Sequence, residues 1–257
     1  MAAHRSAPAL HPAGLLCTAT VDVAADGARW GVPWLAAPAR HTALVRWSRA
    51  AGLPRSWPDA MGLAVRVEAA AGPGRPLDLL LTTSGSGRLG RHLPRMRTNA
   101  VGGPYSTLLS YRFGNRPRII AAFPQSPIPP VGTSVTALAD ALHQRTIRFT
   151  LRAADRNEPW HTFATLTLDA PAPEPAPAPA PAQVKVQSPG FDPYAHYLPL
   201  LHPMGRLAGL RTAAYAGSRT GRGAPGGETG NTGLRTDGGT PRRGEPGTTV
   251  GAGQEPT

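Results

Sequence analysis

The chain has 257 residues and a formal net charge of +12, with 30 glycines and 30 prolines. Glycine and proline together stay just below the share typical of low-complexity chains, so we expect at least one folded domain. The single cysteine, Cys17, excludes an internal disulfide and a cysteine-based zinc site. No apolar run reaches the roughly 18 residues of a membrane-spanning helix, and Pro8 and Pro12 interrupt the N-terminal stretch that a secretion signal would need. We therefore expect a cytoplasmic protein without a membrane span.

The positive charge lies mostly before residue 216, because the remaining tail carries five arginines against four acidic residues. A strongly basic chain attracts phosphate polymers and anionic surfaces at low salt. In residues 1–215, however, the arginines are scattered and do not interleave with aromatic residues in a compact run. This scatter favours a solvated basic surface over a nucleic-acid site, although both interpretations remain open.

Residues 10–168 contain seven short β-rich segments separated by glycine and proline turns. Such spacing, with few helical patterns, is typical of an antiparallel barrel or sandwich. The turn-forming residues 155–158 predict a hairpin, one helix is predicted over 136–143, and Cys17 is expected to be a small buried side chain on a strand. The predicted strands are 15–23, 42–47, 62–68, 77–83, 118–123, 147–153 and 161–168.

The composition changes abruptly after residue 169, where 170–182 read APAPEPAPAPAPA. Alternating proline favours an extended spacer that could reach about 40 Å. Beyond it lies an apolar island at 191–219, in which 204–218 predict a short helix. An isolated helix of this length is marginal in water, so we expect it to pack back onto another part of the chain. The predicted organisation is a barrel domain at 8–168, a linker at 169–190, a helical segment at 191–219 and a disordered glycine-rich tail at 220–257.

Three segments, in a fixed order, carry the motifs of the chain. The first is LHPAG, which ends at Gly14 just before a predicted strand. The second begins with VRWS at 45–48 and continues through Asp59 and GLAV at 62–65 to the Asp-Leu pair at 78–79. The third is RTAAY at 211–215, beyond the linker. Taken together, these segments resemble small, divergent members of the catalase superfamily, over about residues 8–85 and 191–219.

The resemblance implies an antiparallel catalase-type β-barrel with a tethered C-terminal helix and haem b as cofactor. Tyr215 would bind the iron, and Arg211 would stabilise the phenolate form of a side chain whose ordinary pKa is about 10. These two residues are four apart, which places them on one face of a helix. On the opposite side of the haem, His11 would act as general acid and base, with Ser48 orienting its ring. Arg46 would pair with a haem propionate.

Taken one at a time, these residues indicate little. Arginine is so abundant that an arginine four residues before a tyrosine is expected by chance, and such pairs are often helix-surface neighbours. His11 is one of eight histidines, and a serine such as Ser48 at a strand end is usually a turn or capping residue. The common order of all three segments is what indicates a catalase-like ancestry.

The sequence also departs from the family. Where catalases continue Asp-Leu with Val-Gly-Asn-Asn, this chain has Leu80, Leu81, Thr82 and Thr83, so a hydroxyl replaces the amide that hydrogen-bonds peroxide. Pro8 stands where the family has a basic residue three before the distal histidine. We therefore favour a peroxide- or hydroperoxide-linked oxidoreductase, with a small peroxide as substrate, over an efficient catalase. The alternatives are a catalase-derived barrel that serves as a binding scaffold without haem turnover, and a basic nucleic-acid-associated protein. The oligomeric state is open.

Overall fold

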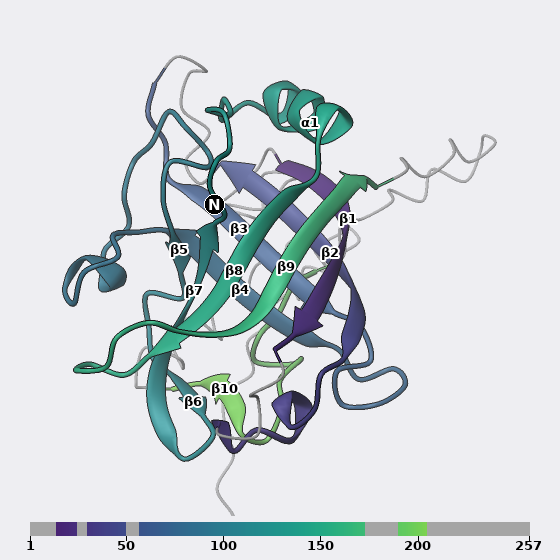
Figure 1. Ribbon diagram of the computed structural model, residues 1–257, viewed down its shortest axis with the longest axis vertical. Helices are drawn as coiled ribbons and strands as arrows, with labels where there is room; N and C mark the ends of the chain where they lie inside the picture. Colours follow the sequence, from purple (N-terminus) through teal and green to yellow (C-terminus); the bar gives the residue numbers. More distant parts are fainter. Residues whose placement is uncertain (1–13, 25–29, 50–56, 173–189, 205–257) are drawn as a thin grey trace, which may run out of the picture. The chain divides into compact units, whose positions relative to one another are not determined.

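The computed structural model describes residues 14–24, 30–49, 57–172 and 190–204. Eight antiparallel strands close into a barrel in the order β1-β2-β3-β4-β5-β7-β8-β9, and β9 pairs back with β1 (Figure 1). Two further strands, β6 and β10, extend the sheet beside β7. The barrel strands are β1 (Gly14–Val23), β2 (Arg40–Arg49), β3 (Met61–Val67), β4 (Leu77–Thr83), β5 (Tyr105–Ser106), β7 (Arg116–Pro124), β8 (Ile147–Ala154) and β9 (His161–Pro171).

All seven predicted strands are confirmed, as is the hairpin between β8 and β9, where the Glu158 amide donates to the Asp155 carbonyl. The predicted helix is α1 (Val135–Gln144), which begins where the Ser134 hydroxyl accepts a hydrogen bond from the Ala137 amide. Strand β9 continues to Pro171, into residues predicted to be linker. The sequence did not predict three short strands, β5, β6 (Tyr111–Phe113) and β10 (Leu201–Pro203), or the 3-10 turns η3 (Pro33–Leu35) and η4 (Gly90–His92).

The inside of the barrel is packed with apolar side chains. Trp47 and Tyr105 each stack edge-to-face on Phe149, with ring centroids 5.9 Å apart in both pairs, and all three residues are fully buried. The Trp47 indole donates to the Tyr105 hydroxyl at 2.9 Å, and that hydroxyl donates to the Ala100 carbonyl at 2.6 Å. Cys17 is buried as expected, and burial raises the pKa of its thiol to about 12. The centre of this barrel is therefore a core, and a ligand site has to be sought on its outer face.

Residues 190–204, which we call the returning segment, pack against the barrel after the Ala-Pro stretch. Strand β10 in this segment pairs with β6, with Leu201 opposite Phe113 (Figure 1). Leu198 and Leu201 are buried in the same apolar core as the barrel strands. The predicted helix over 204–218 lies outside the described residues, apart from Met204.

A single buried carboxylate, that of Asp78 on β4, ties the returning segment to the barrel. Arg66 on β3 donates to both of its oxygens, at 2.8 and 2.6 Å. The Asp192 amide donates to it at 2.7 Å, and the His196 ring lies 2.9 Å from the same oxygen. The Asp78 amide in turn donates to the His196 carbonyl. Because Asp78 is fully buried and its carboxylate is satisfied by groups from both parts of the chain, it holds them together.

We predict that Tyr105→Phe lowers the free energy of unfolding by about 1–3 kcal/mol, because the Trp47 indole and the Ala100 carbonyl each lose a buried hydrogen-bond partner. Urea unfolding followed by tryptophan fluorescence measures this loss. Tyr197→Phe is the matched control, since that side chain is about half exposed. An equal effect of the two substitutions would contradict the role of the Tyr105 hydroxyl.

We also predict that Asp78→Asn lowers the free energy of unfolding by about 3–5 kcal/mol, because it leaves the Arg66 guanidinium without its buried carboxylate partner. Limited proteolysis should at the same time cut the returning segment faster. Asp22→Asn is the control: its ion pair with Arg40 is exposed, so the substitution should leave stability almost unchanged. Unchanged proteolysis of the returning segment in Asp78→Asn would show that this carboxylate does not anchor it.

Candidate functional site

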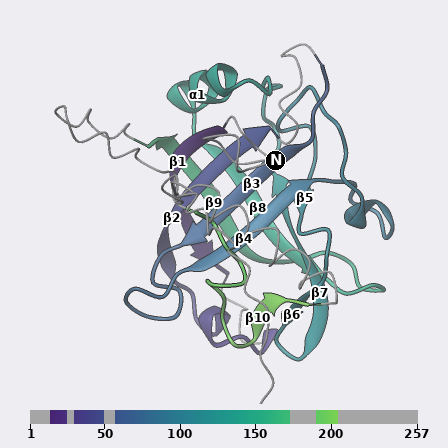
Figure 2. The same ribbon diagram turned by 180° about the vertical axis from the view of Figure 1, so that it is seen from behind.

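The outer face of β1 to β4 carries the site residues that the structure describes. Strands β1 to β4 lie side by side in Figure 2. Cross-strand partners in a sheet share a face, so the pairing register arranges the outward side chains in rows. The first row mixes small and hydroxyl residues, and the second is apolar apart from one arginine. The first row is Gly14, Ser48, Gly62 and Thr82, and the second is Leu16, Arg46, Ala64 and Leu80.

Ser48, near the end of β2, lies beside the first residue of β1. It pairs with Gly14 and is only 4% exposed. A Cβ atom on Gly14 would lie 2.6 Å from the Ser48 Cβ and 3.0 Å from the Arg46 Cζ, so only glycine fits at this position. The register thus brings the end of the LHPAG motif against the VRWS motif, as the predicted site requires. His11 itself lies outside the described residues.

Arg46 occupies the second row, between Leu16 on β1 and Ala64 on β3. All three side chains are partly buried, as is Leu80 on β4. A guanidinium on an otherwise apolar strip suits a flat apolar ligand that carries a carboxylate, because the arginine fork can pair with the carboxylate while the strip contacts the ring. Ser48 and Arg46 therefore share one face, two residues apart on β2.

The two threonines at the end of β4 lie on opposite faces. Thr83 points into the barrel, where its hydroxyl accepts from the Met61 amide at 2.9 Å and donates to the Arg95 carbonyl at 2.7 Å. Thr82 shares the first row with Ser48, across Gly62. The sequence left open which threonine could replace the missing amide. The strand register answers this, because only Thr82 lies on the face of Ser48 and Arg46.

The chemistry of the two rows on the outer face of β1 to β4 fits one side of a haem. The second row offers an apolar strip and a guanidinium for a propionate, and the first row offers two hydroxyls. The other predicted site residues, Arg211 and Tyr215, lie outside the described residues with His11. In the described part of the chain, no three His, Cys, Asp or Glu side chains gather to hold a metal ion. The described residues also include no helix long and apolar enough to cross a membrane.

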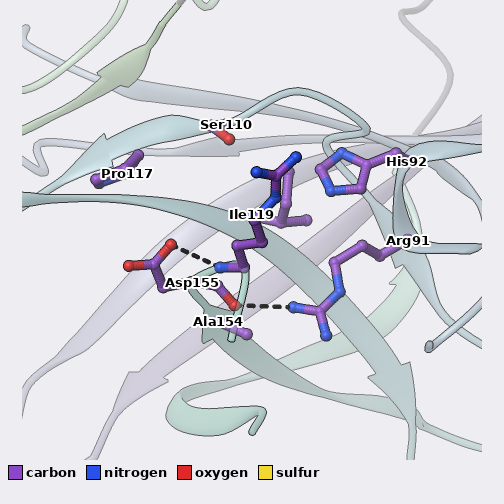
Figure 3. A pocket seen from close by; sticks show the side chains of 8 residues that line it. Arg91, His92, Ser110, Pro117, Ile119, Ala154 and Asp155 are labelled. Atoms are coloured by element: carbon purple, nitrogen blue, oxygen red, sulfur yellow. Dashed lines mark hydrogen bonds between the residues drawn. The ribbon is translucent and has the colours of Figure 1, made fainter. Parts of the chain in front are cut away.

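A separate pocket of about 330 Å³ lies between the loop that follows β4 and the turn that follows β8 (Figure 3). Its lining includes Arg91, which is buried although no carboxylate of the described residues forms an ion pair with it. One guanidinium nitrogen donates to the Asp155 carbonyl, and the guanidinium lies 4.5 Å from the centre of the Trp160 ring. Burial, and then the neighbouring Arg88, lower the pKa of Arg91. No local sequence pattern predicts this arrangement, because it joins residues from loops more than 60 positions apart.

Comparisons by sequence identify no relative: no protein-family model and no curated protein match this chain. Comparison of structures finds proteins of similar fold. A fungal catalase superposes with a TM-score of 0.62 over 84% of this chain and 59% of its own chain, at 12% identity. Catalase A from Saccharomyces cerevisiae gives the same TM-score over 84% of this chain and 61% of its own, at 13% identity.

The chain spans about three-fifths of the length of these catalases. At such low identity the likeness concerns the fold. It agrees with the closed eight-stranded barrel and with the order of motifs in the sequence. The protein therefore has the fold of catalases, with Arg46 and Ser48 together on the outer face of its barrel.

Proposed function

We propose that this protein binds haem b on the outer face of β1 to β4 and acts as a peroxide- or hydroperoxide-linked oxidoreductase. The observation that carries the proposal is the convergence of Gly14, Ser48 and Arg46 on one face. These residues come from two of the three motifs that resemble catalases. The barrel fold, which is that of catalases, is the frame in which such motifs make a haem site.

On the barrel side, Arg46 would bind a haem propionate, and the strip of Leu16, Ala64 and Leu80 would contact the porphyrin ring. Three peptide units separate His11 from Gly14, which limits the distance between their Cα atoms to about 11 Å. His11 can thus reach the face on which Ser48 lies. The Ser48 hydroxyl would accept a hydrogen bond from one ring nitrogen of His11 and leave the other free for proton transfer.

On the opposite side, the iron ligand would be the Tyr215 phenolate, with Arg211 lowering the free-energy cost of its charge. The returning segment supports this role, because Asp78 and β6 fix its course as far as Met204. Eleven residues then lead to Tyr215, a length of about 16 Å if they are helical. The Ala-Pro stretch would serve to bring this ligand back to the barrel.

Bound ferric haem would supply the redox centre of the reaction. The residues of the chain would manage the proton: His11 accepts it from the hydroperoxide and returns it to the leaving oxygen. Thr82 offers a hydroxyl in place of the amide that catalases use, and a neutral hydroxyl holds peroxide in a less fixed geometry than a planar amide. We therefore expect peroxide-dependent oxidation of a second substrate to exceed the dismutation of hydrogen peroxide.

The decisive experiment is the visible absorption spectrum of protein expressed with a haem precursor, compared with that of Tyr215→Phe. We expect a Soret band and high-spin ferric bands in the parent protein and altered bands in the variant, because the phenolate ligand is lost. Tyr197→Phe is the control and should keep the parent spectrum. A featureless parent spectrum would refute haem binding and leave a barrel that acts as a binding scaffold, and a spectrum indifferent to Tyr215→Phe would refute this ligand.

Haem titration of the apoprotein tests Arg46. Arg46→Gln should weaken haem affinity by roughly tenfold, because it removes a charge-assisted hydrogen bond to a propionate. Arg148→Gln, at an exposed position on β8, removes the same charge elsewhere and should leave the affinity unchanged. Circular dichroism verifies that both variants fold. Equal affinities in the two variants would place the propionates away from Arg46.

A further inference from the structure

Residues 85–98, within the connection between β4 and β5, form a loop that projects beside the barrel and carries the short turn η4 (Figures 1 and 2). We call it the basic loop. Its base is closed by hydrogen bonds from the Gly85 amide to the Gly90 carbonyl and from the Arg95 amide to the Thr83 carbonyl. A Cβ on Gly85 would lie 3.0 Å from the Gly90 Cα. The backbone of the loop therefore approaches itself closely at these two glycines.

This loop reverses the usual distribution of side chains. Arg91 is only 4% exposed, whereas Leu89 is 81%, Leu93 is 59% and Met96 is 54% exposed. Folding alone favours the opposite arrangement, because burying a guanidinium costs free energy while exposing leucine forgoes a favourable transfer. Isolated apolar side chains on a surface need no explanation, but three within eight residues around a buried arginine indicate a docking surface.

Several contacts fix the conformation of the loop in which these apolar side chains are exposed. The Trp160 indole donates to the Ser86 carbonyl at 2.8 Å. Arg91 lies against the same indole ring and donates to the Gly87 and Asp155 carbonyls. These contacts tie the loop to the β8–β9 hairpin, with its leucines turned outward. Trp57, which is 61% exposed, lies near the base of the loop, because the Asp59 backbone pairs with Arg97.

The charge around these apolar side chains has one sign. Between Asp78 and Asp140 the chain carries seven arginines and no aspartate or glutamate. Arg88, His92 and Arg95 are exposed beside the leucines. The acidic groups that come near the loop in the described part of the chain are engaged. Asp59, at the base of the loop, is bound by Arg49. In the β8–β9 turn, Asp155 accepts from the Arg156 amide, and Glu158 is bound by Arg116 and Arg118.

We propose that the basic loop docks this protein on an anionic lipid surface. Leu89, Leu93 and Met96 would enter the acyl-chain boundary, while Arg88 and Arg95 bind lipid phosphates. Trp57 is of the residue type enriched at the membrane interface. A nucleic acid is a poorer fit, because the loop itself contains no Phe, Tyr or Trp on which bases could stack. This inference is independent of haem binding.

The test is co-sedimentation of the full chain with vesicles of phosphatidylcholine alone and of phosphatidylcholine mixed with phosphatidylglycerol. Binding is expected only to the mixed vesicles and should weaken as salt is added, because lipid charges are screened. The double variant Leu89→Ser, Leu93→Ser should bind at least about tenfold more weakly, since each buried methylene group contributes roughly fourfold to partitioning. Tyr197→Ser, an exposed apolar position outside the loop, should bind normally.

The charge contribution is tested by Arg88→Gln with Arg95→Gln, which should weaken binding about thirtyfold at low salt. Its control is Arg75→Gln with Arg148→Gln, which removes the same charge from exposed positions elsewhere. No binding to mixed vesicles, or equal binding in all variants, would overturn the proposal. So would a dimer in light scattering that the leucine substitutions dissociate, or tighter binding to single-stranded DNA that depends on the same arginines, because either result would assign the loop to another partner.

Discussion

The interior packing of the barrel is the constraint on which the candidate site depends. Trp47, Tyr105 and Phe149 fill the space between the strands, and their polar atoms are satisfied within the core. Chemistry then falls to the outward positions, which alternate with the core positions along each strand. Arg46 and Ser48 flank Trp47 in the sequence, so this alternation turns both of them outward, and the pairing of β1 with β2 places Gly14 beside them. The same strand geometry gives the barrel the fold of catalases, although the chain shares only 12–13% identity with the two catalases of similar fold.

The buried carboxylate of Asp78 is a second interaction on which the structure depends. A buried carboxylate is unfavourable unless it is fully paired, and here the partners come from β3 and from a segment more than 110 residues later. The motif of which it is part has therefore a structural use that does not depend on haem. Arg91 shows the converse arrangement, a buried cation held by carbonyls and an aromatic ring. Each buried charge holds one segment against the barrel: Asp78 holds the returning segment, and Arg91 holds the basic loop.

The local sequence pattern was sufficient to predict the longer strands. Segment 62–68 alternates between large apolar side chains and others over seven residues, and segment 77–83 is rich in leucine and threonine. Glycine and proline turns mark the ends of both segments, so the residue pattern and the turn signals agree. The same holds for the hairpin turn at 155–158. Strands β5, β6 and β10 are two or three residues long, too short to show a period, and they exist because neighbouring strands offer them hydrogen-bond partners. The order of motifs also led to the fold, although no single motif would have done so.

What the sequence by itself determined is the set of long strands, the core-facing residues on them and the order of the three motifs, because each depends on neighbours in the chain. Only the tertiary structure decided which residues meet. It distinguished Thr82 from Thr83 by register, placed Gly14 against Ser48, joined Asp78 to His196 and turned the leucines of the basic loop outward. These contacts join positions up to 118 residues apart. They follow from barrel closure and strand pairing, which bring distant segments together at distances that no local pattern encodes.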